Sequence, residues 1–507
     1  MTVYNNKLLR GAGVLMPISS LPSKYGIGSL GEESYRFVDF LKRIGCRYWQ
    51  VLPVGPTSYG DSPYQSFSVF AGNPYFIDLD YLALEGLLKP DEVVELSQQG
   101  KEDCVDYATL YRLRFQILRK AYQRSKDRGK KEYSVFCEAN KYWLEDYCFY
   151  MAVKGYYNNG NLLTWEEDIK LREPDALARY RKILEEEIHF WEFCQFKFRE
   201  QWNQLKEYTN QQGIQMIGDI PLYVAADSAD VWVHKGLFEL DQRMNPINVA
   251  GVPPDDFSAD GQRWGNPLYR WDVIEATDFK WWRERMKSSS FLYDVIRVDH
   301  FIGVVNYYSI PAEALTAVEG KWRKGPGNKL TNIISESIGE TKIIAEDLGV
   351  ITPPVRNLIE QTGYPGMKVL QFSLGGPADH EYLPHNFKST NVVAYIGTHD
   401  NETLVGYISD KNQDELRFAY DYYNVSHKTE LPYAVIQALY ASVANVVIVQ
   451  MQDLLQLDNN ARMNSPATIG ENWKWRMTKQ QYKEINEELL REYAENYKRV
   501  PSTTFAK

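Results

Sequence analysis

The sequence predicts an α/β protein, a (β/α)8 barrel with helical insertions. Two observations predict it: eight short apolar runs recur along the 507 residues, and helical patterns lie between many of them. Most of the runs lack strict apolar–polar alternation, which is typical of strands buried on both faces of a parallel sheet. One barrel with insertions can exceed about 400 residues, so the length does not require several domains. An open doubly wound sheet is the structural alternative, but no G-x-G-x-x-G turn follows any run, which argues against dinucleotide binding.

The predicted strands follow one another through the whole chain. In order they are Gly13–Ile18, Tyr48–Val54, Gln215–Ile217, Val295–Val298, Lys342–Ala345, Met367–Phe372, Val392–Ile396 and Val446–Met451. The last belongs to the longest apolar run, Pro432–Val449, which contains Gln437, Ser442 and Asn445. These polar residues argue against a membrane span and favour a buried helix that leads into a strand.

Three of the intervening helices have clear boundaries in the sequence. Residues 32–44 and 195–212 place apolar side chains among charged ones, and the helix that ends at Thr362 begins with Pro353 and Pro354. A glycine follows each of them, at Gly45, Gly213 and Gly363. Proline in the first turn and glycine after the last are typical helix boundaries.

The spacing of the runs predicts the domain organisation. About 160 residues separate the second run from the third, and residues 81–189 are highly charged with helical patterns. We therefore expect a catalytic barrel formed by residues 1–80 and 190–507, with residues 81–189 as an inserted helical subdomain. Residues 479–497 predict a charged amphipathic helix that closes the barrel.

Composition narrows the class of function. The chain is 44% hydrophobic and 24% charged, which excludes disordered, collagen-like and disulfide-scaffold proteins. A net charge of −10 argues against nucleic acid or an anionic membrane as the main partner and suits a neutral substrate. Five cysteines without a C-x-x-C pair, and an N-terminus without an apolar signal region, predict a reduced, cytoplasmic protein. Aromatic residues make up 14%; they fill cores and can also form platforms for apolar ring faces.

Four predicted strands end in an acidic residue. Asp219, Asp299, Glu346 and Asp400 each follow an apolar run, and catalytic residues of a barrel lie at the carboxyl ends of its strands. A single acid there is usually a helix cap or a solvated loop residue. Four clustered carboxylates repel one another and are costly unless catalysis or a metal uses them.

The sequence lacks the motifs of several other kinds of catalytic or binding site. Calcium-loop and H-E-x-x-H patterns are absent, so we expect no metal. A G-x-S-x-G elbow and a phosphate-binding G-x-x-x-x-G-K-[ST] loop are absent as well, and no cofactor is expected. What remains is acid–base chemistry by carboxyl groups.

Glycoside cleavage with retention needs one ionised and one protonated carboxyl group about 5–5.5 Å apart. Arg297 lies two residues before Asp299, hence on the same face of its strand, and would keep Asp299 ionised as a nucleophile requires. Glu346, at the end of an apolar run and near other acids, should have a raised pKa, as an acid catalyst requires.

At these residues the chain resembles the α-amylase clan. The blocks are Arg297-Val-Asp299-His300-Phe301, Ala345-Glu346-Asp347-Leu348-Gly349 and Thr398-His399-Asp400-Asn401. Further blocks, such as Gly218-Asp219-Ile-Pro-Leu-Tyr-Val, Gly261-Gln-Arg-Trp264-Gly-Asn-Pro and Arg462-Met-Asn464-Ser-Pro-Ala, resemble its 4-α-glucanotransferase branch, the amylomaltases or disproportionating enzymes. The resemblance covers roughly residues 8–500. It implies a (β/α)8 TIM barrel with helical insertions and no separate C-terminal β-domain, and nothing after Met451 looks like such a domain.

The resemblance also implies the site and the activity. Asp299 would be the nucleophile, Glu346 the general acid/base and Asp400 the third acid, which binds and distorts the sugar. Residues matching family positions around the sugar or along the clefts are Tyr64, Asp219, Trp264, Arg297, His300, His399 and Asn464, with the loop at Asp255. The partners would be α-1,4-glucans and malto-oligosaccharides as donors, and glucose or a malto-oligosaccharide as acceptor; this branch generally needs no calcium.

Three alternatives share the same acids in whole or part: an α-glucan hydrolase of the same clan, the transferase half of a debranching enzyme, and a catalytically inactive glucan-binding protein. A single barrel without a second catalytic block argues against the debranching enzyme, and the presence of all three acids argues against the inactive protein. Transfer requires that water be excluded, for which two segments rich in Pro, Gly and aromatic residues, 249–267 and 461–476, are suited. We expect Trp264 to contact the sugar. Core packing is expected for Trp191, Trp281 and Trp282, and either role fits Trp473 and Trp475.

Overall fold

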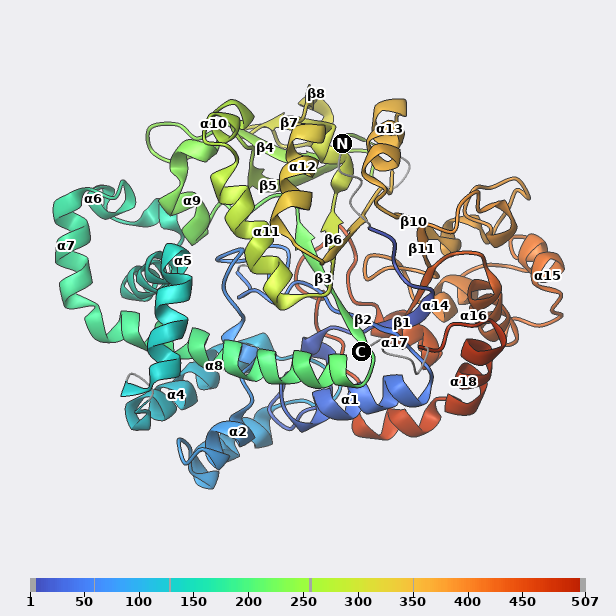
Figure 1. The fold of residues 1–507 in the computed structure, drawn as a ribbon, viewed down its shortest axis with the longest axis horizontal. Helices are drawn as coiled ribbons and strands as arrows, with labels where there is room; N and C mark the ends of the chain where they lie inside the picture. The colour runs from blue at the N-terminus through green and yellow to red at the C-terminus, as the bar shows by residue number, and fades with distance from the viewer. Residues whose placement is uncertain (1–5, 59, 127–128, 255–257, 350, 502–507) are drawn as a thin grey trace.

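The computed structural model describes residues 6–58, 60–126, 129–254, 258–349 and 351–501. At its centre eight parallel strands pair in the order β10-β11-β12-β1-β2-β3-β6-β9. The two end strands of that order meet, because the N–H of Ala345 at the end of β9 donates to the carbonyl of Pro365 just before β10, at 3.0 Å. The sheet is therefore a nearly closed barrel, as the sequence predicts (Figure 1).

Each barrel strand coincides with one of the eight predicted runs. The strands are Gly11–Leu15 (β1), Tyr48–Gln50 (β2), Gln215–Pro221 (β3), Val295–Asp299 (β6), Lys342–Ala345 (β9), Gly366–Val369 (β10), Val392–Tyr395 (β11) and Val446–Gln450 (β12). Every residue of β1 and β12 is buried. Because the barrel interior and the helix layer both cover the strands, the apolar runs show no alternation.

Helices follow most of the barrel strands. The principal ones outside the insertion are Glu32–Arg43 (α1), Lys280–Leu292 (α11), Asn328–Ser337 (α12), Pro353–Thr362 (α13), Leu431–Ala441 (α16) and Glu487–Asn496 (α18), and shorter ones are Ala229–Val233 (α9), Trp271–Ala276 (α10), Leu404–Ser409 (α14), Arg417–Tyr423 (α15) and Met451–Leu454 (α17). The predicted helix ends are confirmed: prolines occupy the first turn of α13, and Gly45, Gly213 and Gly363 are left-handed, with φ of 76°, 80° and 67°. The predicted start at residue 195 is wrong, because that helix already begins at Glu185.

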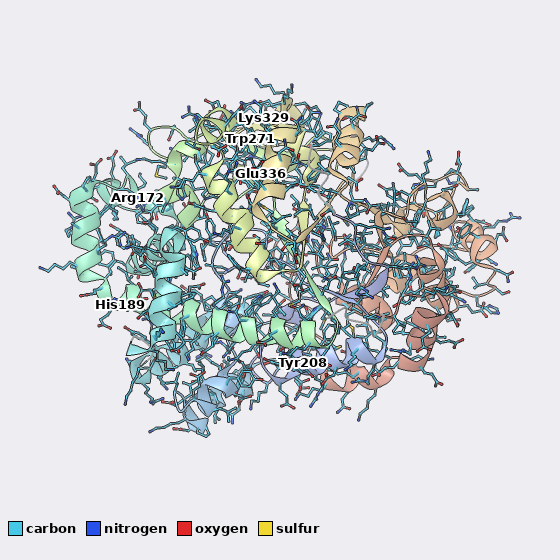
Figure 2. The ribbon with its side chains drawn as sticks, viewed as in Figure 1. Arg172, His189, Tyr208, Trp271, Lys329 and Glu336 are labelled. Carbon is cyan, nitrogen blue, oxygen red and sulfur yellow. The ribbon has the colours of Figure 1, made fainter. Side chains whose placement is uncertain are left out.

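The segment between β2 and β3 carries the helical insertion, which lies on the left of Figure 1. Its helices are Leu79–Leu84 (α2), Val94–Gln99 (α3), Tyr107–Arg124 (α4), Lys131–Tyr156 (α5), Glu167–Lys170 (α6), Pro174–Ile183 (α7) and Glu185–Gln211 (α8). His189 lies near the start of α8 and Tyr208 near its end (Figure 2), where the Tyr208 hydroxyl donates to Asp39 of α1 at 2.6 Å. The expected boundary between residues 189 and 190 thus falls inside one continuous helix that reaches the barrel.

A second, antiparallel sheet lies outside the barrel. Its strands pair in the order β5-β4-β7-β8: Gln262–Pro267 (β5), Asn248–Val252 (β4), Asn306–Pro311 (β7) and Lys321–Lys324 (β8). The sequence predicts no strand in the segment 249–267, yet β4 and β5 lie at its two ends. The strands were not predicted because β4 pairs with β7, which is distant in the sequence. β4 also contains Gly251, a residue type typical of loops, which is required here because a Cβ would lie 2.1 Å from the carbonyl oxygen of Gln262.

The prediction of one helix over residues 479–497 is also wrong in part. A 3-10 helix covers Lys479–Glu484, and α18 begins anew after Asn486, whose side chain accepts the N–H of Leu489. A side-chain cap that satisfies a free N–H fixes a new helix start there. Residues 432–449 form α16 and β12, as expected, and no described helix combines the length and apolarity that a membrane crossing needs.

Candidate active site

The predicted acids meet at one end of the barrel. Asp219 lies in β3, Asp299 is the last residue of β6, Glu346 directly follows β9, and Asp400 lies in the turn after β11. In the parallel register of β3 and β6, Asp219 is the partner of Arg297 and Pro221 that of Asp299. Since parallel strands end at the same face of a barrel, residues distant in the chain converge there.

Arg297 is shared between two carboxylates. Its Nη1 donates to both oxygens of Asp219, at 2.8 and 2.6 Å, and to Oδ1 of Asp299 at 3.0 Å. Its Nε lies 3.5 Å from the sulfur of Met367. The hydroxyl of Tyr64 donates to the second oxygen of Asp219 at 2.8 Å. Asp219 is thereby fully paired in the interior, whereas Asp299 keeps one oxygen free of the guanidinium.

The electrostatics of Asp299 differ from the expectation. Burial raises the pKa of Asp299 well above its ordinary value; Arg297 opposes this, and the charges of Asp219, Glu346 and Asp400 raise it further. Arg297 thus acts on the pKa of Asp299 in the expected direction, but burial and the neighbouring acids outweigh it. The physical reason is that one guanidinium serves a cluster of acids and is bound most closely by Asp219.

Glu346 is held by two backbone groups. The N–H of His300 donates to Oε2 and the N–H of Leu348 to Oε1, both at 2.7 Å. His300 has a left-handed backbone with φ of 53°, which is uncommon outside glycine. Burial raises the pKa of Glu346, while Arg297 and the two N–H groups lower it, so the net direction is the expected one.

The imidazole of His300 is buried against Trp264. The two rings meet edge to face with centroids 4.8 Å apart. Burial lowers the pKa of His300 to about 4, so the ring is neutral at neutral pH. Its Nε2 has no hydrogen-bond partner within the part of the chain that the structure describes. A buried, unpaired ring nitrogen is a site that a ligand hydroxyl can satisfy.

Asp400 is oriented from the segment after β12. Nδ2 of Asn464 donates to its Oδ1 at 2.6 Å, and Arg462 donates to its backbone carbonyl at 2.8 Å. Nε2 of His399 lies 3.3 Å from Oδ2. Arg462 was not among the predicted residues; its only sequence signal was its place in the block that ends at Asn464.

Three aromatic rings form a wall beside the acids. Tyr64 stacks on His399 with centroids 5.1 Å apart and planes 17° apart, and Trp473 lies 5.8 Å from Tyr64 and 5.9 Å from His399. Trp473 adopts a left-handed backbone, and its carbonyl accepts from the hydroxyl of Tyr107 at 3.0 Å. The sequence left Trp473 undecided, because a tryptophan in a glycine-rich segment fits both a core and a site.

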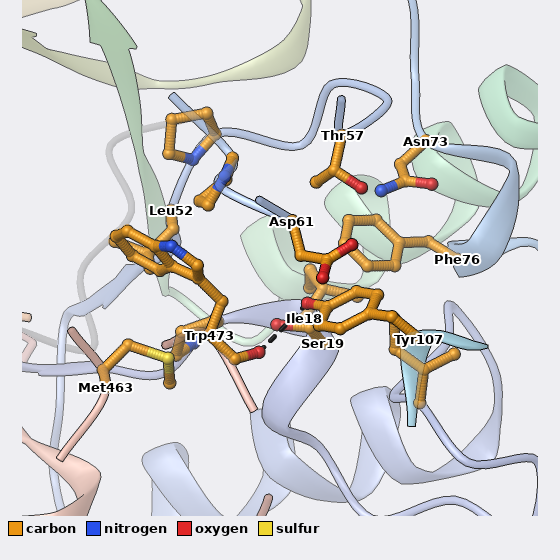
Figure 3. A pocket seen from close by; sticks show the side chains of 14 residues that line it. Ile18, Ser19, Leu52, Thr57, Asp61, Asn73, Phe76, Tyr107, Met463 and Trp473 are labelled. Carbon is orange, nitrogen blue, oxygen red and sulfur yellow. Dashed lines mark hydrogen bonds between the residues drawn. The ribbon is translucent and has the colours of Figure 1, made fainter. Parts of the chain in front are cut away.

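Trp473 also lines a small pocket that is partly open to solvent. Leu52, Asp61, Tyr107 and Met463 are among its other walls (Figure 3). The pocket therefore adjoins the aromatic wall, next to the segment 461–476.

Three other tryptophans lie in the core, where the sequence predicts them. Trp191, Trp281 and Trp282 are buried core residues, as predicted. The backbone of Trp475 forms an isolated antiparallel bridge with Cys104 of the insertion. The loop at Asp255 lies outside the described residues.

The ten predicted residues form two contact groups that meet at the consecutive residues Asp299 and His300. One group is Tyr64, Asp219, Arg297, Asp299, His399, Asp400 and Asn464, and the other is Trp264, His300 and Glu346. Over the described ranges, no group of three His, Cys, Asp or Glu residues could hold a metal ion. The arrangement offers paired carboxyl groups, one cation and aromatic ring faces, which suits acid–base chemistry on a neutral sugar.

A family model described as 4-alpha-glucanotransferase matches residues 16–481. The chain belongs to the 4-alpha-glucanotransferase family. The 4-alpha-glucanotransferase of Clostridium butyricum is 46% identical over 463 residues, which cover 91% of this chain and 95% of that protein. That of Streptococcus pneumoniae TIGR4 is 44% identical over 494 residues, 97% of this chain and 98% of the other.

A solved structure leads to the same family. The amylomaltase from Streptococcus agalactiae, in complex with acarbose, is 42% identical with a TM-score of 0.93 and covers 97% of this chain and 100% of that one. As a member of the family this chain is a transglycosylating enzyme acting on α-1,4-glucans. The predictions of family, fold and enzyme class are confirmed, and neither the hydrolase nor the inactive binding protein is favoured.

Proposed function

We propose that the enzyme cleaves an α-1,4 bond of a malto-oligosaccharide or longer glucan and passes the donor segment, with retention, to a hydroxyl group of glucose or another malto-oligosaccharide. The observation that carries this proposal is that two acids stand at the ends of neighbouring strands: the partly exposed Asp299 ends β6, and the buried Glu346 follows β9. Around them, the excess of acids over the single cation Arg297 favours a sugar that develops positive charge.

In the first step Asp299 attacks the anomeric carbon while Glu346 donates its proton to the departing oxygen. The bond to the leaving sugar breaks as the ester to Asp299 forms. Burial, which raises the pKa of Glu346, supports its role as the proton donor. Asp299 attacks as the carboxylate, the form that the Arg297 guanidinium favours by lowering its pKa and that the developing positive charge on the sugar stabilises.

In the second step Glu346 takes the proton of the acceptor hydroxyl, whose oxygen attacks the anomeric carbon and releases Asp299. The N–H groups of His300 and Leu348 stabilise Glu346 as the carboxylate that this step requires. The same residue therefore serves as acid first and as base second.

The other predicted residues bind the sugar at the point of cleavage. Asp400, held by Asn464, accepts hydroxyl groups, and His300 and His399 supply neutral ring nitrogens. Trp264 and Tyr64 present ring faces to apolar sides of the sugar. Asp219 and Arg297 keep the carboxyl group of Asp299 in place.

We further propose that residues 81–189 act as an inserted helical subdomain and that the enzyme works in the cytoplasm without a nucleic-acid partner. All five cysteines are free, which supports a reducing compartment. The net charge of −10 is unsuited to a polyanion.

The experiment compares Asp299→Asn and Glu346→Gln on maltotriose and on α-maltosyl fluoride. Asp299→Asn should lose activity on both donors, because an amide is a poor nucleophile. Glu346→Gln should lose activity on maltotriose and regain part of it on the fluoride, whose departure needs no proton. Asp299→Asn with wild-type activity, or Glu346→Gln without any preference for the fluoride, would overturn the assignment.

The balance of transfer and hydrolysis is measured in the same reaction. Transfer from maltotriose releases glucose and longer chains while the number of reducing ends stays constant. Hydrolysis raises that number with every bond cleaved. A yield of reducing ends equal to the number of bonds cleaved would refute transfer.

A further inference from the structure

The turn that carries His399 and Asp400 is anchored from outside as well as within. We call residues 398–404 the Asp400 loop. Inside it, the N–H and the hydroxyl of Thr398 both donate to Oδ1 of Asn401, at 2.8 and 3.0 Å. These bonds fix the shape of the turn but not its position relative to the barrel.

Asp453 supplies an anchor from the next barrel strand. It lies in α17, which directly follows β12, and its Oδ1 accepts the N–H of Leu404 at 2.7 Å. Leu404 is the first residue of α14, and the first N–H groups of a helix have no partner within the helix. One carboxylate therefore fixes the end of the Asp400 loop to the end of β12.

The segment after Asp453 holds the same loop at other points. Oδ1 of Asn459 accepts the N–H of Thr403 at 3.3 Å, and its Nδ2 donates to Glu402 at 2.7 Å. The approach is so close that a Cβ at Gly406 would lie 2.1 Å from Oδ1 of Asn459. Asp453 is thus the first of a series of contacts between this segment and the loop.

Burying the carboxylate of Asp453 is energetically unfavourable. It is 1% exposed, and its Oδ2 has no hydrogen-bond partner among the residues described. Burial raises the pKa of Asp453 to about 7, and the Leu404 N–H is the one contact that opposes the shift. An asparagine would provide a similar acceptor without burying a charge, so stability alone does not account for a carboxylate.

We propose that the carboxylate of Asp453 is a positioning residue for Asp400: its bond to the Leu404 N–H sets the Asp400 loop at the distance from Asp299 and Glu346 that the transition state requires. A bond to an ionised acceptor is shorter and roughly twice as strong as a neutral one. Asp453 itself does not touch the sugar. This inference rests on the proposed role of Asp400.

The test uses Asp453→Asn, which keeps the size of the side chain and removes a buried charge, so the variant should fold at least as stably as the wild type. At a pH at least one unit above the pKa of about 7, where Asp453 is ionised, kcat on maltotriose should fall about three- to tenfold while KM changes less than twofold. Asp78→Asn is the control, because Asp78 is also buried and accepts the first-turn N–H of Tyr81 in α2, outside the Asp400 loop; its second oxygen also accepts the hydroxyl of Ser29 at 2.6 Å. Its kcat should not change.

A double-mutant cycle separates positioning from general stability. In an Asp400→Asn background, measured with α-maltosyl fluoride, the change at Asp453 should cost less than twofold, because the group that it positions is gone. An equal loss in both backgrounds, or a wild-type kcat for Asp453→Asn, would overturn the inference. If Asp400→Asn by itself kept wild-type activity, the proposed role of Asp400 would fail instead.

Discussion

Replacing Arg297 by methionine tests whether this cation is required for the fold as well as for catalysis. The change removes three contacts to carboxylate oxygens, two on Asp219 and one on Asp299. The side chain of Asp219 is fully buried, and only the Tyr64 hydroxyl remains to pair it, whereas the side chain of Asp299 is 27% exposed and can be hydrated. The cost should therefore come mainly from Asp219. Removing one partner of a buried ion pair typically costs about 3–5 kcal/mol.

Urea unfolding followed by tryptophan fluorescence measures this loss. Arg283→Met is the matched control, because Arg283 pairs with Glu336 at 2.8 Å on the surface, and its loss should cost about 0–1 kcal/mol. Adding Asp219→Asn to the Arg297 variant should restore much of the stability without restoring activity, since the unpaired buried charge is then gone. A single Arg297 variant as stable as the wild type, or a double variant no more stable than the single one, would refute the reasoning.

Three further predictions concern pH, transfer and metals. Because Asp219 raises the pKa of Asp299, Asp219→Asn should shift the acid limb of the kcat/KM profile, where activity falls as Asp299 is protonated, to lower pH; an unmoved limb would contradict the coupling. Trp264→Ala should expose His300 to water and raise the yield of reducing ends per bond cleaved. Trp322→Ala, on the exposed strand β8, should leave this yield unchanged. Activity should survive exhaustive treatment with EDTA, and a loss that calcium restores would reveal a site that the sequence motifs do not show.

Much of the barrel could be predicted because its signals are local. A strand buried on both faces is mostly apolar, and each of the eight runs has this property independently of its neighbours. The second sheet gave no such signal. Strand β8, for example, reads Lys321-Trp-Arg-Lys324 and lies mostly exposed at the sheet edge, so neither alternation nor an apolar run marks it.

The site divides in the same way. Acids after strands can be found by position, since a barrel brings the carboxyl ends of its strands to one face. Position in the sequence does not show how Arg297 is shared between the acids. Arg297 is two residues from Asp299 in the sequence, yet its closest contact is Asp219, 78 positions away and adjacent only through the β3–β6 register.

The sequence by itself determined the barrel strands, their acidic ends and the resemblance to a family, because each depends on residue types at fixed places along the chain. Only the tertiary structure decided that Asp219 competes for Arg297, that Trp473 joins the aromatic wall, and that Asp453 anchors the Asp400 loop. These are contacts between segments that the chain brings together only on folding. Burial then changes the energies of the charges involved, because removing a carboxyl group from water raises its pKa by an amount that its neighbours decide.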